Sequence, residues 1–320
     1  MKRSGSVVVA SRSFSKHPLL REELASRYER VVFNETGRML EGSELVAFLK
    51  GHERAIIGLE TLDSNIISQL TDLKIIGKHG VGLDKIDLLA LERQGIRFGW
   101  VGGVNRRSVA ELALGFMLSL LRHVPATNSE VRAGVWQPRV GQQLTEKTIG
   151  IIGCGFIGKD LIELLKPFRC RVLVNDIRDY REFYERHSVT HTTLDELLKQ
   201  SDIVTLHIPY EPATHHIISA ERLALMKPSA ILINTARGGL VDEQALKKCL
   251  ASGKLAGAAF DVFAVEPPAD KELVELPHFL STPHIGGSAE EALVAMGRAA
   301  IEGLESASSP RELYERLNAR

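Results

Sequence analysis

The sequence predicts an α/β protein with two doubly wound parallel sheets. Short β-branched runs alternate with helical patterns along nearly the whole chain, which is typical of βαβ units. The 320 residues correspond to roughly two domains at the usual ~150 residues each. With 44% hydrophobic and 25% charged residues, the composition is that of an ordinary globular protein. We therefore expect two compact domains, each with its own core.

The first hundred residues predict one open sheet. Five runs are expected to be strands: Ser6–Ala10, Arg30–Phe33, Arg54–Leu59, Leu73–Lys78 and Ile96–Gly99. Between them, helical patterns cover Pro18–Tyr28, Gly42–Lys50 and Leu88–Gln94. The next helix, Ser108–Arg122, has apolar residues on several faces, so it is expected to be a buried connector.

A second series of runs predicts a second sheet. Its strands are expected at Thr148–Ile152, Arg171–Asn175, Asp202–His207, Ala230–Asn234, Ala256–Phe260 and Phe279–Ser281. Helices are indicated by TLDELLKQ, SAERLALMKP and DEQALKKCLASGK. The last long helix, Ser288–Ser306, has little of its own to pack on and is expected to return to the first domain. That domain then comprises residues 1–101 and 287–320 around a second domain of residues 102–286, and the tail after residue 306 is expected to fray.

Charge and hydropathy argue against two kinds of partner. Lys plus Arg and Asp plus Glu each number 40, so no net charge is available to hold nucleic acid or an anionic membrane. No apolar run reaches the roughly 18 to 20 residues of a membrane span, and the polar start lacks a signal-peptide core. The three cysteines, Cys154, Cys170 and Cys249, are expected to be free thiols. We expect a cytoplasmic protein.

The segment TIGIIGCGFIG predicts a dinucleotide-binding loop. Gly153, Gly155 and Gly158 follow a predicted strand and open a helix at the GxGxxG spacing. The first glycine permits a tight turn, the second lets the backbone approach a pyrophosphate, and the third lets the helix pack closely on the strand. The amides near Phe156 and Ile157 would face the anion at the helix N-terminus.

An acidic residue completes this pattern. Asp176 stands 18 residues beyond the last glycine, at the end of the next predicted strand. There its carboxylate would accept hydrogen bonds from ribose hydroxyls and repel a 2′-phosphate. The segment therefore predicts a Rossmann domain that binds NAD rather than NADP, although Arg178, two residues later, weakens the distinction.

Several polar or small residues follow the remaining strands of the second sheet. Open α/β sheets bind ligands outside the carboxyl ends of their strands, so these residues are expected to converge on one site. We assign to the cofactor pocket His207, Pro209, Thr235, Ala236, Asp261 and Gly286.

Three further residues are candidates for catalysis. Arg237 could bind a carboxylate with both arms of its guanidinium and polarise a carbonyl. His284 suits proton transfer because the ordinary pKa of histidine is near ~6.5. Glu266, in DVFAVEPP, could orient the ring of His284 and stabilise the imidazolium.

The motifs GCGFIG, INTARGGLVDEQAL, FDVFAVEPP and PHIGG, in this order and at these separations, resemble the D-isomer-specific 2-hydroxyacid dehydrogenases. The resemblance extends to HGVGLDKIDL, SVAEL, the GVW turn and LHIP, and so covers essentially the whole chain. It implies a Rossmann NAD-binding domain inserted in a flavodoxin-like substrate domain. It also implies a homodimer with the connector region at its interface.

The resemblance implies roles for individual residues. Arg237 would bind the substrate's carboxylate and carbonyl, His284 would be the general acid and base, and Glu266 its partner. The backbone amides around Val81 and Gly82 would help to hold the carboxylate. The resemblance also assigns Asp261 to the nicotinamide amide. The expected substrate is a small D-2-hydroxy or 2-keto acid such as glycerate, hydroxypyruvate or phosphoglycerate.

One departure leaves the substrate open. Many members carry an Arg-Ser-x-Thr segment after the third strand, which meets a phosphate in phosphoglycerate dehydrogenases, but here the segment contains Gly58, Leu59 and Glu60. Lys78 and His79, just before the Gly80–Gly82 loop, could supply positive charge instead, or Lys78 could be a solvated strand-end residue. A C-terminal regulatory domain like that of long phosphoglycerate dehydrogenases is not expected.

Other interpretations remain. The chain could be an NADH-sensing, corepressor-like binding protein, a short-form phosphoglycerate dehydrogenase, or a relative that acts on formate or phosphite, although formate dehydrogenases have Gln where Glu266 stands. No metal site is expected: His187 and His191 are four residues apart, but no carboxylate or thiol cluster accompanies them.

Overall fold

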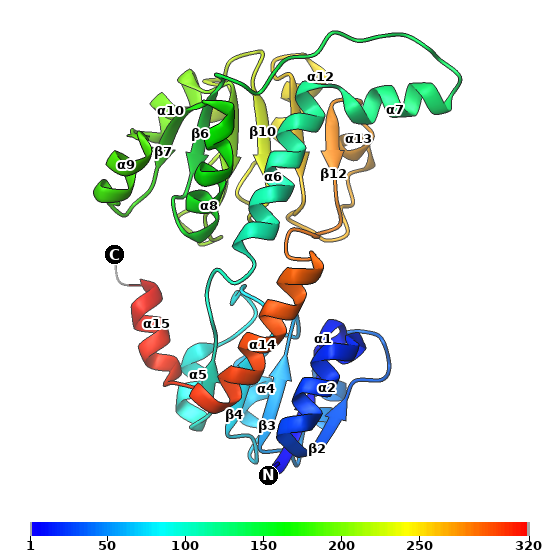
Figure 1. Cartoon of the computed structure of the whole chain (residues 1–320), viewed down its shortest axis with the longest axis vertical. Coiled ribbons are helices and arrows are strands. Elements are labelled where there is room, and N and C mark those ends of the chain that lie inside the picture. Colours follow the sequence, from blue (N-terminus) through cyan, green and yellow to red (C-terminus); the bar gives the residue numbers. More distant parts are fainter. Residues whose placement is uncertain (1, 319–320) are drawn as a thin grey trace. The chain divides into compact units, whose positions relative to one another are not determined.

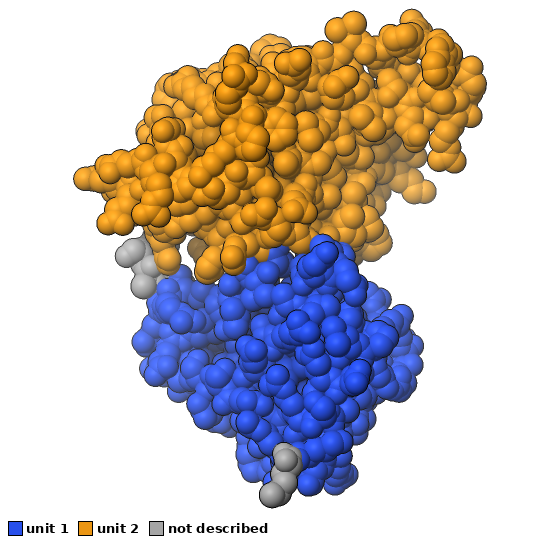
Figure 2. Space-filling model, viewed as in Figure 1, with its two compact units in different colours: residues 1–105, 287–320 blue, residues 106–286 orange. Residues whose placement is uncertain are grey.

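A computed structural model describes residues 2–318 (Figure 1). The chain divides into two compact units, coloured separately in Figure 2. Unit 1 runs up to Asn105 and resumes at Gly287, and unit 2 is Arg106–Gly286. Unit 1 is therefore discontinuous in sequence.

Unit 1 contains a five-stranded parallel sheet. The order is β2-β1-β3-β4-β5, with β1 (Arg3–Val9), β2 (Tyr28–Phe33), β3 (Arg54–Ile57), β4 (Ile75–Lys78) and β5 (Arg97–Gly99). This is the doubly wound, flavodoxin-like order. The helices are α1 (Arg12–Lys16), α2 (Pro18–Arg27), α3 (Gly42–Leu49), α4 (Ser64–Ser68), α5 (Leu88–Gln94), α14 (Glu290–Ser306) and α15 (Pro310–Asn318).

Both faces of this sheet are buried. Along β1, Val8 packs into the core on one face, while Val7 and Val9 pack into the core on the other. Successive side chains of a strand point to opposite faces, so an uninterrupted run of valines is what a strand covered on both sides requires.

The helix α14 lies on unit 1 through close backbone contacts. A Cβ added at Gly77 in β4 would lie 2.2 Å from the carbonyl oxygen of Ala300, and one added at Gly99 in β5 would lie 2.2 Å from that of Gly303. Only glycine permits such approach of helix and strand. The expectation that this helix packs with the first strands is confirmed.

For residues 307–318 the expectation that the tail frays is wrong; residues 319–320 lie outside the part of the chain that the structure describes. Residues Pro310–Asn318 form α15, and Leu313 is 3% exposed in the core of unit 1. Just before the helix, Ser308 exchanges backbone hydrogen bonds with Phe98, and Ser309 Oγ donates to Glu92 Oε2 at 2.8 Å. One buried leucine and contacts remote in sequence hold this helix, so local composition does not reveal it.

Unit 2 contains a seven-stranded parallel sheet of order β12-β11-β10-β9-β6-β7-β8. Its strands are β6 (Thr148–Ile152), β7 (Arg171–Asn175), β8 (Thr190–His191), β9 (Ile203–Leu206), β10 (Ile231–Asn234), β11 (Gly257–Phe260) and β12 (Phe279–Ser281). The order reverses between β6 and β9, as in a Rossmann fold, and such a switch point is where dinucleotides bind. The predicted fold class is confirmed.

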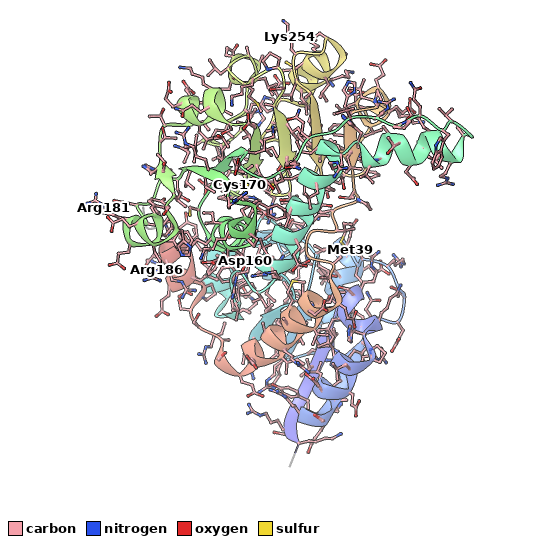
Figure 3. All side chains as sticks on the ribbon, turned by 45° about the horizontal axis from the view of Figure 1, so that its top comes forward. Met39, Asp160, Cys170, Arg181, Arg186 and Lys254 are labelled. Carbon is pink, nitrogen blue, oxygen red and sulfur yellow. The ribbon has the colours of Figure 1, made fainter. Side chains whose placement is uncertain are left out.

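The helices of unit 2 are α6 (Arg106–Leu121), α7 (Val124–Arg132), α8 (Phe156–Leu165), α9 (Arg181–His187), α10 (Leu194–Gln200), α11 (Ala220–Leu223), α12 (Glu243–Ala251) and α13 (Lys271–Val274), with a 3-10 turn at Lys166–Phe168. The helix α6 is buried against α8, β10 and β11, as its apolar faces predict. Asp160 of α8, labelled in Figure 3, accepts a hydrogen bond from Arg107 of α6 at 2.7 Å. Within residues 2–318 no single helix is long and apolar enough to cross a membrane; α6 and α7 meet that test only as a pair bent by 62°.

Candidate active site

The glycine loop between β6 and α8 is closely packed at two of its three glycines and open at the third. Gly153 has a φ of +97°, and a Cβ there would lie 2.5 Å from the carbonyl oxygen of His207. A Cβ at Gly158 would lie 2.1 Å from the carbonyl oxygen of Gly153. At Gly155, in contrast, a Cβ would meet no atom within 4 Å. Two of the glycines are therefore needed for packing, and the third leaves the backbone open to a ligand such as a pyrophosphate.

Asp176 joins two loops at the carboxyl edge of the sheet. Its Oδ2 accepts a hydrogen bond from the amide of Cys154 in the glycine loop at 2.5 Å, and its Oδ1 accepts one from the amide of Arg178 at 2.8 Å. Phe156 and Ile177, which stand on these two loops, are 59% and 87% exposed. The carboxylate is thus held beside uncovered apolar side chains, where it could meet the hydroxyls of a ribose.

Seven buried side-chain polar atoms lack hydrogen-bond partners within residues 2–318, and two of them belong to the predicted cofactor pocket. These two are His207 Nδ1 and Thr235 Oγ1, at the carboxyl ends of β9 and β10. Burial lowers the pKa of His207 to about 3, so its ring is neutral, and its Nε2 lies 3.0 Å from Thr205 Oγ1. Buried polar groups are normally satisfied. These two atoms and the open glycine loop fit a polar cofactor at the switch point.

His284 and Glu266 form a hydrogen-bonded pair. His284 Nδ1 lies 2.9 Å from Glu266 Oε2, and the two side chains are 46% and 40% exposed. Because Nδ1 faces the carboxylate, Nε2 is the ring atom available for proton transfer. The pairing predicted from the sequence is therefore present.

The histidine stands on a loop that Asp261 organises. His284 has a φ of +54°, and its amide is held by the carbonyl of Asp261 at 2.9 Å. The Asp261 side chain is 1% exposed and accepts hydrogen bonds from Thr282 Oγ1 at 2.5 Å and from the amides of Ile285 and Gly286 at 2.7 Å each. A left-handed backbone at a non-glycine residue persists only where its surroundings enforce it. This supporting role was not predicted; its signal in the sequence is an acid that ends a buried strand.

Arg237 stands on a turn built by Asn234. The buried Asn234 donates from Nδ2 to the carbonyl of Arg237 at 2.8 Å and accepts from the amide of Ala236 at 3.1 Å. A Cβ added at Gly238 would lie 1.9 Å from the carbonyl oxygen of Phe263. The loop of Arg237 therefore rests, backbone on backbone, against the turn that carries Glu266.

The predicted residues of unit 1 lie at the carboxyl edge of its own sheet. Lys78 is 4% exposed and donates from Nζ to the carbonyl of Gly58 at 2.5 Å, so the interpretation as a solvated strand-end residue is wrong. Glu60, 1% exposed, accepts from the amide of Gly58 at 2.5 Å. Beside them the buried ring of His79 has its Nδ1 2.8 Å from Ser11 Oγ. Burial lowers the pKa of His79 to about 4, so the expectation that His79 supplies positive charge is wrong.

The amides of Val81 and Gly82 donate no hydrogen bond within the described residues, and both residues are partly exposed. The carbonyl of Val81 accepts from Trp100 Nε1 at 3.0 Å, which orients this loop. Gly80, at φ +129°, starts the turn, and a Cβ there would lie 3.2 Å from Lys78 Nζ. The loop thus offers the backbone amides of Val81 and Gly82 as donors, next to the buried ammonium group of Lys78.

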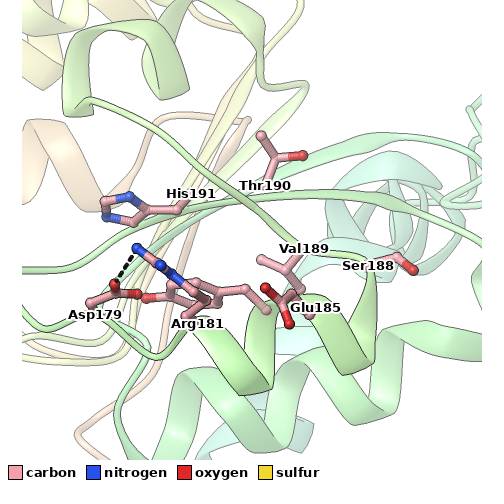
Figure 4. Close-up of a pocket in the computed structure, with 8 residues that line it drawn as sticks. Asp179, Arg181, Glu185, Ser188, Val189, Thr190 and His191 are labelled. Atoms are coloured by element: carbon pink, nitrogen blue, oxygen red, sulfur yellow. Dashed lines mark hydrogen bonds and ion pairs between the residues drawn. The ribbon is translucent and has the colours of Figure 1, made fainter.

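A surface hollow of about 630 Å³ lies beside β8 and α9 (Figure 4). Its lining includes Asp179, Arg181 and His191, and Arg181 Nη2 lies 3.4 Å from Asp179 Oδ2. None of the predicted cofactor or catalytic residues lines it, so we do not place the reaction there. Nearby, His187 lies 3.1 Å from Glu163, and within residues 2–318 no three His, Cys, Asp or Glu side chains are grouped to hold a metal ion.

Comparisons with known proteins agree with this geometry. Residues 114–286 match the sequence model of the D-isomer specific 2-hydroxyacid dehydrogenase, NAD binding domain. D-3-phosphoglycerate dehydrogenase from Methanocaldococcus jannaschii is 37% identical over 89% of this chain and 55% of its own length, so the chain spans about half of that relative. Hydroxypyruvate reductase from Thermotoga maritima is 36% identical over 83% of this chain and 88% of its own length.

Among solved structures, D-lactate dehydrogenase from Aquifex aeolicus, in complex with NAD and lactic acid, is 27% identical with a TM-score of 0.81. The match covers 94% of each chain. The cofactor of the matched domain is NAD, the group that the glycine loop, Asp176 and the unpartnered atoms at β9 and β10 fit. The chain belongs to the D-isomer-specific 2-hydroxyacid dehydrogenase family.

Proposed function

We propose that the protein is an NAD-dependent oxidoreductase that interconverts a small 2-keto acid and the corresponding D-2-hydroxy acid. The observation that carries this proposal is the His284–Glu266 pair, 2.9 Å apart and open to solvent, in the same unit as the dinucleotide loop. Names of relatives support it, because they include glycerate dehydrogenase and hydroxypyruvate reductase.

The proposed mechanism divides the work among three residues. NADH, held by the glycine loop and Asp176, would supply the hydride to C2 of the keto acid. Arg237 binds the carboxylate and polarises the carbonyl, because a guanidinium matches both oxygens. The protonated His284, oriented by Glu266, donates its Nε2 proton to the carbonyl oxygen, which yields the hydroxyl. In the oxidative direction the neutral ring takes that proton back, and Glu266 stabilises the imidazolium.

In unit 1, we assign the carboxylate contact to the amides of Val81 and Gly82. Lys78 adds positive charge behind this loop without leaving its buried position, since its Nζ is hydrogen-bonded to Gly58. In unit 2, the cofactor contacts are assigned to the glycine loop, Asp176 and the strand ends. Both domain assignments, substrate to unit 1 and NAD to unit 2, belong to the proposal.

The favoured substrate class is a keto acid with an uncharged group on C3, such as hydroxypyruvate. The segment after β3 places the buried carboxylate of Glu60, rather than an exposed cation, on the backbone of Gly58. No Lys or Arg stands in this segment, residues 58–63, to bind a phosphate. Phosphoglycerate oxidation by a short-form enzyme is the alternative that relatives named D-3-phosphoglycerate dehydrogenase support.

We also propose that the protein is a homodimer that works in the cytoplasm. Four apolar side chains are left uncovered on α7 and the segment after it: Val131, Val135, Trp136 and Val140, at 53%, 44%, 86% and 96% exposed. Exposed apolar surface of this kind marks an interaction site. The three cysteines are unpaired in the structure, which suits a reducing compartment.

The test is NADH oxidation by the purified protein across hydroxypyruvate, glyoxylate, pyruvate and 3-phosphohydroxypyruvate, repeated with NADPH. We expect the highest kcat/KM with hydroxypyruvate and NADH. Preference for the phosphorylated acid would identify the short-form alternative. Tight NADH binding without turnover of any acid would reject the dehydrogenase in favour of an NADH-sensing binding protein.

A further inference from the structure

We propose that Glu243 is a positioning residue of the acid–base pair: it holds the turn Phe263–Glu266 in place, and through that turn it holds Glu266 against His284. The inference rests on the proposed function, because it assumes that this pair moves the proton. It adds a residue that touches neither substrate nor cofactor and acts through Glu266.

The contact that carries the proposal is a hydrogen bond between two elements. Glu243 is the first residue of α12, and its Oε1 accepts from the amide of Ala264 at 2.8 Å. The preceding amide, that of Phe263, donates to Glu266 Oε1 at 3.2 Å. The other oxygen of Glu266 faces His284. Two consecutive amides of one turn thus donate to the two carboxylates. The carboxylate of Glu243 fixes the turn, and the position of the Glu266 carboxylate depends on that turn.

Glu243 is not required to cap its own helix. Asp242 does that, because its side chain accepts from the amide of Ala245 at 3.0 Å. Leu246, one turn further on, is 0% exposed and anchors the helix in the core. The start of α12 is therefore fixed without Glu243. The Glu243 carboxylate can then bind the neighbouring turn from a fixed position.

The surroundings of Glu243 are unusual for a merely solvated glutamate. Burial raises the pKa of Glu243, and the Ala264 amide acts against that shift. The charged or titratable groups that face it are His216, Asp242 and Asp270. Within residues 2–318 it forms no ion pair. The main partner of this half-buried carboxylate is one backbone amide. We therefore infer that the carboxylate serves to hold that amide in place.

The same turn also supports Arg237. The segment that begins at Arg237 ends at Glu243, and its first glycine, Gly238, packs on the carbonyl of Phe263. Both ends of this segment therefore rest on the turn that carries Glu266. Supporting contacts of this kind keep reacting groups correctly oriented. In metal sites, their loss typically reduces activity about 10- to 100-fold.

The experiment compares three variants of Glu243 in the full chain. Glu243→Ala removes the contact, Glu243→Asp keeps the charge but shortens the reach, and Glu243→Gln keeps an acceptor oxygen at the same distance. We expect kcat to fall about tenfold in the Ala and Asp variants and to be largely retained in Gln, with the KM for NADH unchanged. Glu221→Gln, which alters an exposed glutamate in the first turn of α11 that accepts from Ser219 Oγ, is the control.

A double-mutant cycle with Glu266→Ala separates positioning from general stability. If Glu243 acts mainly through Glu266, then Glu243→Ala lowers kcat about tenfold in the wild type but much less when Glu266 is already Ala, where only the support of Arg237 through the same turn is lost. Additive losses, or an Asp variant as active as wild type, would overturn the proposal. If the Ala variant does not fold, the Asp and Gln variants carry the same comparison.

Failure of the proposed function is recognised separately. A wild-type protein that turns over no keto acid contradicts the dehydrogenase assignment, and the inference about Glu243 falls with it. A wild-type protein that turns over a keto acid while the cycle is additive contradicts the inference alone. Thermal unfolding of each variant and NADH titration show that the fold and the cofactor site are retained.

Discussion

The carboxyl edges of the two sheets collect polar residues in opposite ways. In unit 2, His284 and Glu266 face solvent with 46% and 40% of their side-chain surface exposed. In unit 1, Glu60 and Lys78 are 1% and 4% exposed and are bonded to the same glycine, Gly58. Both edges are built by parallel strands, but the polar pair of unit 2 is open to solvent and the polar pair of unit 1 is buried.

The difference indicates how the work is divided. An open edge can exchange protons with a substrate, whereas a closed edge of paired buried groups contributes shape, backbone donors and a fixed charge. In unit 1 the groups that we propose for substrate recognition are the amides of Val81 and Gly82. We therefore expect substitutions at the edge of unit 2 to alter catalysis, and substitutions at the edge of unit 1 to alter stability and substrate affinity.

The largest effect is expected at the open edge. Arg237→Gln removes a charged, two-pronged contact to the carboxylate, and kcat/KM for the keto acid is predicted to fall about 10³-fold. Thermal stability should stay near that of the wild type. Arg222→Gln, which alters another arginine of unit 2 paired with Asp195, is the control. A loss below threefold would show that Arg237 does not bind the acid.

At the closed edge the expected effect is on stability. Burial lowers the pKa of His79 to about 4, from 6.5 in the unfolded chain, so the unfolded state binds more protons between these values. The contribution of neutral His79 to the free energy of unfolding should therefore be fully present above pH 6.5. The free energy of unfolding should fall by up to about 3 kcal/mol on acidification to pH 4.

The measurement is urea unfolding of the full chain between pH 4 and 7.5, for wild type and His79→Gln. The variant should lose this part of the pH dependence while kcat at pH 7.5 changes less than twofold. His207, whose pKa is lowered to about 3, acts in the same direction in unit 2 and is unaffected by the substitution. Identical pH dependence in both proteins would refute the closed-edge description.

A substitution in the proposed cofactor site of unit 2 should have a smaller effect on kinetics than Arg237→Gln. Asp176→Ala removes the carboxylate that joins the glycine loop to the loop after β7. We predict that the KM for NADH rises about tenfold and that the preference over NADPH narrows, since the repulsion of a 2′-phosphate is lost. Steady-state kinetics with both cofactors measure this, and unchanged constants would remove Asp176 from the site.

The smallest effect is expected from the buried charge of unit 1. Lys78→Met should raise the KM for the keto acid about fivefold and leave kcat within twofold, because the ammonium acts at a distance through its charge. Lys78→Arg keeps the charge and is the control. A fall in kcat as large as that of Arg237→Gln would mean that the edge of unit 1 takes part in the chemistry.

The sequence reveals those parts of the site that depend on local order. The glycine loop, Asp176 and the residues after β9, β10 and β12 follow from strand ends and spacing, because parallel strands bring their carboxyl ends together. The pairing of Glu266 with His284 was likewise predicted from residue chemistry.

Other features depend on contacts that spacing does not record. The amides that Asp261 and Glu243 accept from belong to loops remote in sequence or on another element, so neither role can be read from the motif alone. The burial of Lys78 and Glu60 depends on how the loops after β3 and β4 fold over the strand ends. The helix α15 depends on Leu313 reaching a core formed by residues more than two hundred positions earlier.

The most direct test of the central claim is single-turnover reduction of the preferred keto acid by His284→Ala, with the NADH dissociation constant measured on the same sample. The account predicts that the rate of hydride transfer falls at least ~10²-fold, while NADH binds within twofold of wild type. A near-normal rate with normal NADH binding would contradict the assignment of His284 as the acid and base, and with it the role of the open edge of unit 2.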